Sequence, residues 1–126
     1  MQVTNFLWVA LGGAIGSVGR YWAAAAVAAL TGPRFPWGTL LINVVGSFVI
    51  GWFGALTADS GPLAVPAGIR LLVLVGICGG FTTFSSFSLQ TFELLQSGEM
   101  VRAAGYVLGS VALCLLFVWF GVLLGR

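Results

Sequence analysis

The chain has 126 residues, of which 60% are hydrophobic and only 6% are charged, with five arginines and no histidine. A soluble domain carries about 25% charged residues, so this chain has too little charge to cover a surface that faces water. The composition excludes an ordinary soluble domain and predicts an all-α integral membrane protein surrounded by lipid, with no nucleic-acid partner.

Four apolar segments are expected to cross the membrane: residues 5–30, 37–58, 66–95 and 100–124. Each reaches the ~20 residues that a spanning helix needs, and together they form one transmembrane domain over residues 1–126. The N-terminus lacks a basic region and a cleavage site, so the first segment is predicted to be a membrane helix and not a signal peptide. The short connections are expected to make successive helices antiparallel, with both termini on one side.

The first segment carries Arg20, the only charge well inside an apolar stretch. Two roles remain open for it. The side chain snorkels to the membrane interface, or it draws anions into a vestibule.

Polar side chains recur at every fourth residue of the second and fourth segments and so share one face of each helix. They are Thr39, Asn43 and Ser47, and Tyr106, Ser110 and Cys114. Most donate hydrogen bonds and no carboxylate lies among them, which suits an anion pathway. The alternative is hydrogen bonding between helices.

The third segment contains the polar stretch "CGGFTTFSSFS" at residues 78–88. Its glycines and threonines predict a helix break near residues 78–83. Freed carbonyls at a break can coordinate a cation, and helix N-termini attract anions; a kink tolerated by packing is the alternative. Phe81, Phe84 and Phe87 recur every third residue. Aromatic ring edges are weakly electropositive, so an anion could pass them without tight binding.

The arginines divide evenly between the two sides of the membrane. Arg70 and Arg126 lie with the termini, whereas Arg34 and Arg102 lie opposite. Because positive charge sets orientation, either a partner or the first helix decides it, or the protein inserts both ways and pairs with an inverted copy. Three glycine pairs with a spacing of four favour close helix packing and support an oligomer: Gly12 and Gly16, Gly76 and Gly80, and Gly105 and Gly109.

The stretches "GGAIGSVGRYW", "WGTLLINVVGS" and "GGFTTFSSFS" together resemble the helix motifs of the Fluc (CrcB) fluoride channels, and the resemblance covers all four segments. It implies a passive fluoride-selective channel of the bacterial inner membrane that lowers cytoplasmic fluoride, built as an antiparallel dual-topology homodimer with two pores. It also implies a structural Na⁺ at the dimer interface, with no organic cofactor. That ion would be held by the backbone carbonyls of Gly79 and Thr82. The expected ion pathway comprises Arg20, Thr39, Asn43, Phe84, Phe87, Tyr106 and Ser110.

Two positions depart from the pattern of these channels. Residue 114 is Cys where many members carry Ser, and residue 90 is Gln where an acid is expected. Cys78 and Cys114 are expected to be packing residues and not a disulfide or a metal site.

Other functions remain as alternatives. The sequence has no catalytic triad, phosphate loop or acid–base pair, so it is not interpreted as an enzyme. One alternative is a small dual-topology multidrug-type exporter, which would usually keep an acid or His within the membrane. The other is a membrane scaffold that transports nothing.

Overall fold

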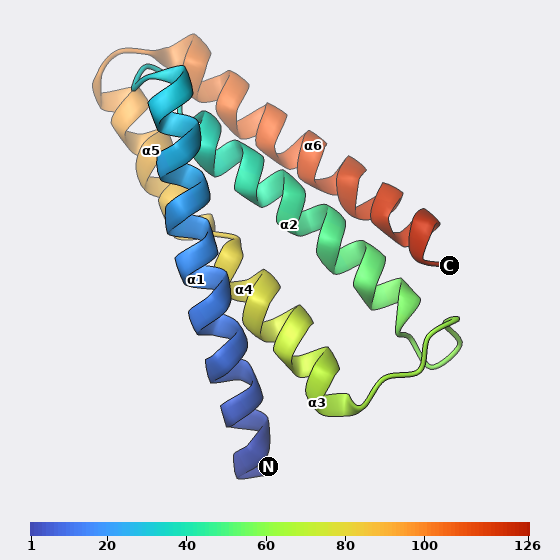
Figure 1. The fold of residues 1–126 in the computed structure, drawn as a ribbon. Coiled ribbons are helices and arrows are strands. Elements are labelled where there is room, and N and C mark those ends of the chain that lie inside the picture. Colours follow the sequence, from blue (N-terminus) through green and yellow to red (C-terminus); the bar gives the residue numbers. More distant parts are fainter.

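The computed structural model describes residues 1–126 and contains helices and no strands (Figure 1). Three long helices are continuous, and the remaining segment is divided into four consecutive pieces. The continuous helices are α1 (Val3–Thr31), α2 (Trp37–Leu56) and α6 (Met100–Gly125); the divided segment comprises α3 (Ala67–Arg70), η1 (Leu71–Ile77), α4 (Cys78–Phe81) and α5 (Phe84–Gln96).

Three helical segments are both long and apolar enough to cross a membrane: Trp37–Leu56, Ala67–Gln96 and Met100–Gly125. Helix α1 is also long enough at 29 residues, but Arg20 and several small or polar residues interrupt its apolar sequence. It packs along η1 and α4. The expectation of an all-α membrane protein is confirmed.

The helices form an open arrangement and not a closed bundle (Figure 1). Helices α2 and α6 lie side by side, while α1 lies against the third segment. The two short loops at residues 32–36 and 97–99 meet at one end, and both termini lie toward the other. Only 16 of the 126 residues are buried, so lipid or another chain must cover most of the apolar surface.

The predicted break in the third segment is present, and threonines form it. Thr82 and Thr83 have extended backbones, with ψ angles of 156° and 111°. Gly79 and Gly80, by contrast, stay helical within α4. The Thr83 side chain caps α5, because its Oγ1 accepts a hydrogen bond of 3.1 Å from the Ser86 amide. Threonine is a favoured N-cap residue, so the helix restarts at this position.

The segment before the break is a π-helix over Leu71–Ile77, which the sequence did not predict. Here the backbones of α1 and η1 touch: a Cβ added at Gly76 would lie 2.7 Å from the Cα of Gly12. A Cβ added at Gly80 would likewise lie 2.7 Å from the Gly13 carbonyl oxygen on α1. These glycines were expected to support an oligomer. Their close contacts lie within one chain, so Gly12, Gly76 and Gly80 do not provide that support. Gly105 and Gly109 have nothing within 4 Å of an added Cβ.

Candidate ion pathway

A cavity of about 400 Å³ opens beside the interruption in the third segment, between α2, α4, α5 and α6. We call it the break cavity. It brings together six of the predicted site residues, namely Asn43, Gly79, Thr82, Phe84, Phe87 and Ser110, and both cysteines. Arg20, Thr39 and Tyr106 are not among the residues that line it. Side chains from three separate segments of the chain therefore meet at one place.

Asn43 holds the extended backbone of the break. Its Oδ1 accepts a hydrogen bond of 2.7 Å from the Thr83 amide, and its Nδ2 donates one of 3.1 Å to the Thr83 carbonyl. Thr83 is buried, so these two bonds give partners to backbone groups that lie outside any helix. From the sequence, the Asn43 side-chain amide was expected to donate a hydrogen bond to an anion. An Asn amide has two N–H groups, so one donor remains after the bond to Thr83.

Arg20 contacts the same break from the other side. Its Nε donates a hydrogen bond of 3.0 Å to the Gly80 carbonyl, a role that neither sequence-based alternative included. Arg20 also lines a second cavity, of about 350 Å³, which it shares with Thr39 and Gln90. Helix α1 and helix α2 thus each contribute one long polar side chain that anchors the interruption.

Aromatic rings form a row that leaves the break cavity along α5 and α6. The centroids of Phe84 and Phe87 are 5.4 Å apart, and those of Phe87 and Tyr106 are 5.1 Å apart. The Tyr106 ring meets Phe35 edge-on at 5.4 Å. Phe81 does not belong to this row, because its ring lies near Gly19 and Gly46, between α1 and α2. Two of the three regularly spaced phenylalanines therefore line the cavity.

The polar stripe on α6 divides into satisfied and unsatisfied hydroxyls. Tyr106 donates a hydrogen bond of 2.8 Å to Gln90 Oε1. The Ser110 Oγ is buried and has no hydrogen-bond partner in the chain. On α2, Ser47 donates to the Asn43 carbonyl of its own helix at 2.7 Å. Ser110 is thus the stripe hydroxyl whose donor is free inside the break cavity. The contact of Gln90 with α6 was not predicted from the sequence, in which Gln90 stood out only as a departure from the family pattern.

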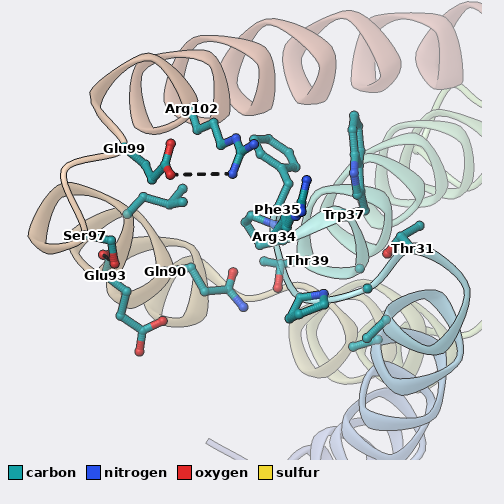
Figure 2. Close-up of a pocket in the computed structure, with 17 residues that line it drawn as sticks. Thr31, Arg34, Phe35, Trp37, Thr39, Gln90, Glu93, Ser97, Glu99 and Arg102 are labelled. Carbon is teal, nitrogen blue, oxygen red and sulfur yellow. Dashed lines mark hydrogen bonds and ion pairs between the residues drawn. The ribbon is translucent and has the colours of Figure 1, made fainter.

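A larger cavity of about 620 Å³ lies at the end of the molecule where the two short loops meet. Its lining residues include Gln90, Thr39, Arg34 and Glu93, which Figure 2 labels. Glu99 and Arg102 form an ion pair of 3.8 Å at its rim. We call this cavity the vestibule. Because Thr39 and Gln90 line both the vestibule and the 350 Å³ cavity, these two spaces adjoin.

Two backbone carbonyls at the break lack the donors that a continuous helix would give them. The Thr83 amide bonds to Asn43 and so leaves the Gly79 carbonyl without its usual helical partner. The Thr82 carbonyl receives no hydrogen bond, whereas the Cys78 carbonyl accepts two, both from Thr82. No group of three or more His, Cys, Asp or Glu side chains could hold a metal ion. The free carbonyls at the break are hard oxygen ligands, the type that suits a hard cation.

A broken membrane helix beside free donors, aromatic edges and uncapped carbonyls contains the parts from which ion-conducting proteins are built. The family described as CrcB-like protein, Camphor Resistance (CrcB), matches residues 7–122. The chain belongs to this family.

Relatives from several bacteria share about half of their residues with the chain. A fluoride-specific ion channel FluC of Methylocella silvestris is 55% identical over 93% of this chain and 89% of its own length. A fluoride-specific ion channel FluC of Opitutus terrae is 57% identical over 92% of this chain and 88% of its own length. A fluoride-specific ion channel FluC of Rhodospirillum rubrum is 52% identical over 93% of this chain and 91% of its own length.

Proposed function

We propose that the chain is a fluoride-specific ion channel of the bacterial cell membrane, through which fluoride leaves the cytoplasm passively. The observation that carries the proposal is the break cavity. It gathers a free hydroxyl at Ser110, the spare amide N–H of Asn43 and the rings of Phe84 and Phe87, with no carboxylate among its lining residues. The relatives named fluoride-specific ion channel FluC support the choice of ion.

The N-terminus of α5 adds a second attraction for anions. The helix starts at Phe84, beside the break cavity, and a helix N-terminus carries a partial positive charge. In the proposed pathway, fluoride exchanges water for the donors of Asn43 and Ser110 and passes the ring edges of Phe84 and Phe87. Arg20 and Thr39 line the approach from the vestibule, and Tyr106 supports the Phe87 ring.

The position of the acids argues against the exporter alternative. Glu93 and Glu99 line the vestibule at the end of the helices, and Asp59 lies in the loop after α2. None of the three lines the break cavity. A proton-coupled exporter usually keeps an acid within the membrane, so a passive anion pathway fits these residues better.

The working channel in our proposal is an antiparallel homodimer that inserts in both orientations. Two features of the chain support it. The break cavity is open on the side of Phe84, whose side chain is 78% exposed, and Gly79 is exposed beside it. The arginines also divide two and two between the membrane sides, apart from Arg20, which leaves orientation nearly balanced. A second, inverted copy would close the cavity and complete two equivalent pores.

A structural Na⁺ at the dimer interface is the second part of this proposal. The carbonyls of Gly79 and Thr82 lack their helical donors, and hard oxygen ligands suit a hard cation. Two such carbonyls from each inverted chain would supply four ligands. Since the backbone would provide them, Thr82→Ser should retain the ion. A dimer structure in sodium without density between the two breaks would contradict the proposal.

The deciding experiment is fluoride efflux from liposomes that contain the purified protein. A channel releases loaded fluoride down its gradient once an ionophore that carries a counter-cation dissipates the membrane potential, and the channel then limits the efflux rate. A coupled exporter would need a proton gradient, and a scaffold would give the rate of empty liposomes. Asn43→Asp is expected to lower efflux to the rate of empty liposomes. Efflux no faster than from empty liposomes would refute the channel.

A further inference from the structure

The break cavity contains a thiol at a position where an ion would pass. Cys114 is a free, half-buried cysteine on α6, one helical turn after Ser110. Ser110 lines this cavity and is 6% exposed, and its Oγ is buried without a hydrogen-bond partner. A buried, unpartnered hydroxyl calls for an explanation, and an ion bound beside it would supply one. Cys114 therefore lines the same cavity as a hydroxyl that has no partner within the chain.

The second thiol of the cavity differs in access. Cys78 is only 3% exposed and begins α4 beside the break. The other polar lining groups, from Asn43, Ser47, Thr82, Thr83 and Ser110, offer oxygen or amide nitrogen. Soft metal ions prefer thiolate sulfur to such groups. Cys114 is the more accessible of the two soft ligands in the cavity.

We propose that Cys114 is an inhibitory site for soft metal ions of the Ag⁺ class, which bind its sulfur beside Ser110 and stop ion flow through the break cavity. This inference rests on the proposed channel function. In the binding step the thiol S–H bond breaks, its proton passes to water and an S–Ag bond forms, with no change of oxidation state. The thiolate is the species that ligates the metal.

Two effects of the bound ion would stop conduction. The metal occupies part of a cavity of about 400 Å³ that Phe84 and Phe87 already narrow. The silver thiolate also lies beside Ser110, so it blocks the access of fluoride to that hydroxyl donor, and conduction needs a favourable site for the ion to enter. Inhibition should persist after free metal is washed away and reverse when a competing thiol is added.

The test uses full-length protein in liposomes, first without metal to establish the fluoride efflux rate. Silver nitrate is then added in chloride-free buffer, and each variant is compared with its own rate before addition. Wild-type efflux should fall about tenfold, as expected when a thiophilic ion occupies a narrow pathway. Cys114→Ser and Cys114→Ala should lose this sensitivity, and dithiothreitol should restore the wild-type rate. Cys78→Ala should remain as sensitive as the wild type.

Intact-protein mass spectrometry of the same samples gives a readout independent of flux. A silver adduct on the wild type and on Cys78→Ala, but not on either Cys114 variant, is the expected result. Wild-type efflux that silver leaves unchanged would overturn the inference while leaving the channel intact. Sensitivity that disappears only in Cys78→Ala would overturn it too, because the site would be the other thiol. Absence of efflux before silver would instead refute the proposed function.

Discussion

Removing the Asn43 side chain tests whether the break depends on it. In Asn43→Ala the Thr83 amide and carbonyl both lose their partners, at 2.7 and 3.1 Å, while Thr83 stays buried. Each unsatisfied buried group costs about 1–3 kcal/mol, so the loss of both partners is expected to lower the unfolding free energy by about 2–6 kcal/mol. Asn43→Asp keeps the acceptor for the amide but sets an oxygen against the Thr83 carbonyl, and adds negative charge to the pathway.

Both variants should lose fluoride efflux, for partly different reasons. Their unfolding free energies, from denaturant titration in detergent, should fall, and their efflux rates should fall to that of empty liposomes. The matched control is Ser47→Ala, one turn along α2, which removes only a bond to the carbonyl of its own helix. It should keep wild-type stability within about 0.5 kcal/mol. Wild-type stability and wild-type flux in Asn43→Ala would refute the reasoning.

Three further outcomes are expected. Phe84→Ile and Phe87→Ile should each lower fluoride efflux about tenfold by removing an electropositive ring edge, with oligomer size unchanged on gel filtration; wild-type flux in both would reduce the rings to packing. Gly76→Ala should cost about 1–3 kcal/mol of stability, since its Cβ would lie 2.7 Å from the Gly12 Cα, whereas Gly105→Ala has open space and should cost nothing; equal losses would contradict this packing. A single cysteine placed at the C-terminus, with both native cysteines replaced, should be labelled about half from outside intact cells; labelling from one side only would exclude dual topology.

The sequence was sufficient to predict the class of the molecule and the location of its break. A chain with 6% charged residues and four long apolar segments has too little charge to cover a surface that faces water. In lipid, its backbone must form helices to satisfy its own hydrogen-bonding groups. The polar stretch at residues 78–88 stood out because such residues are uncommon at membrane depth. Asn43, Phe84, Phe87 and Ser110 were recognised by helical spacing and family resemblance, and the structure places all four at one cavity.

The partners of the long polar side chains could not be predicted. Arg20 binds a carbonyl 60 residues away, and Tyr106 binds Gln90 16 residues away. A long side chain can reach several groups, and it bonds to the one that helix packing brings within about 3 Å. The periodicity of the sequence does not specify which group that is.

The residues by themselves determined a helical membrane protein with a polar interruption in its third segment, because hydrophobicity and helical period are local properties. Only the tertiary structure decided what each polar or small residue does. The contact between Gly12 and Gly76 exists because α1 crosses the π-helical segment at that height, and so belongs to the interior of one chain. The restart of the helix at Thr83 depends equally on its own hydroxyl and on an amide from α2. Such contacts join segments that are distant in sequence, and their geometry is set by how the helices pack.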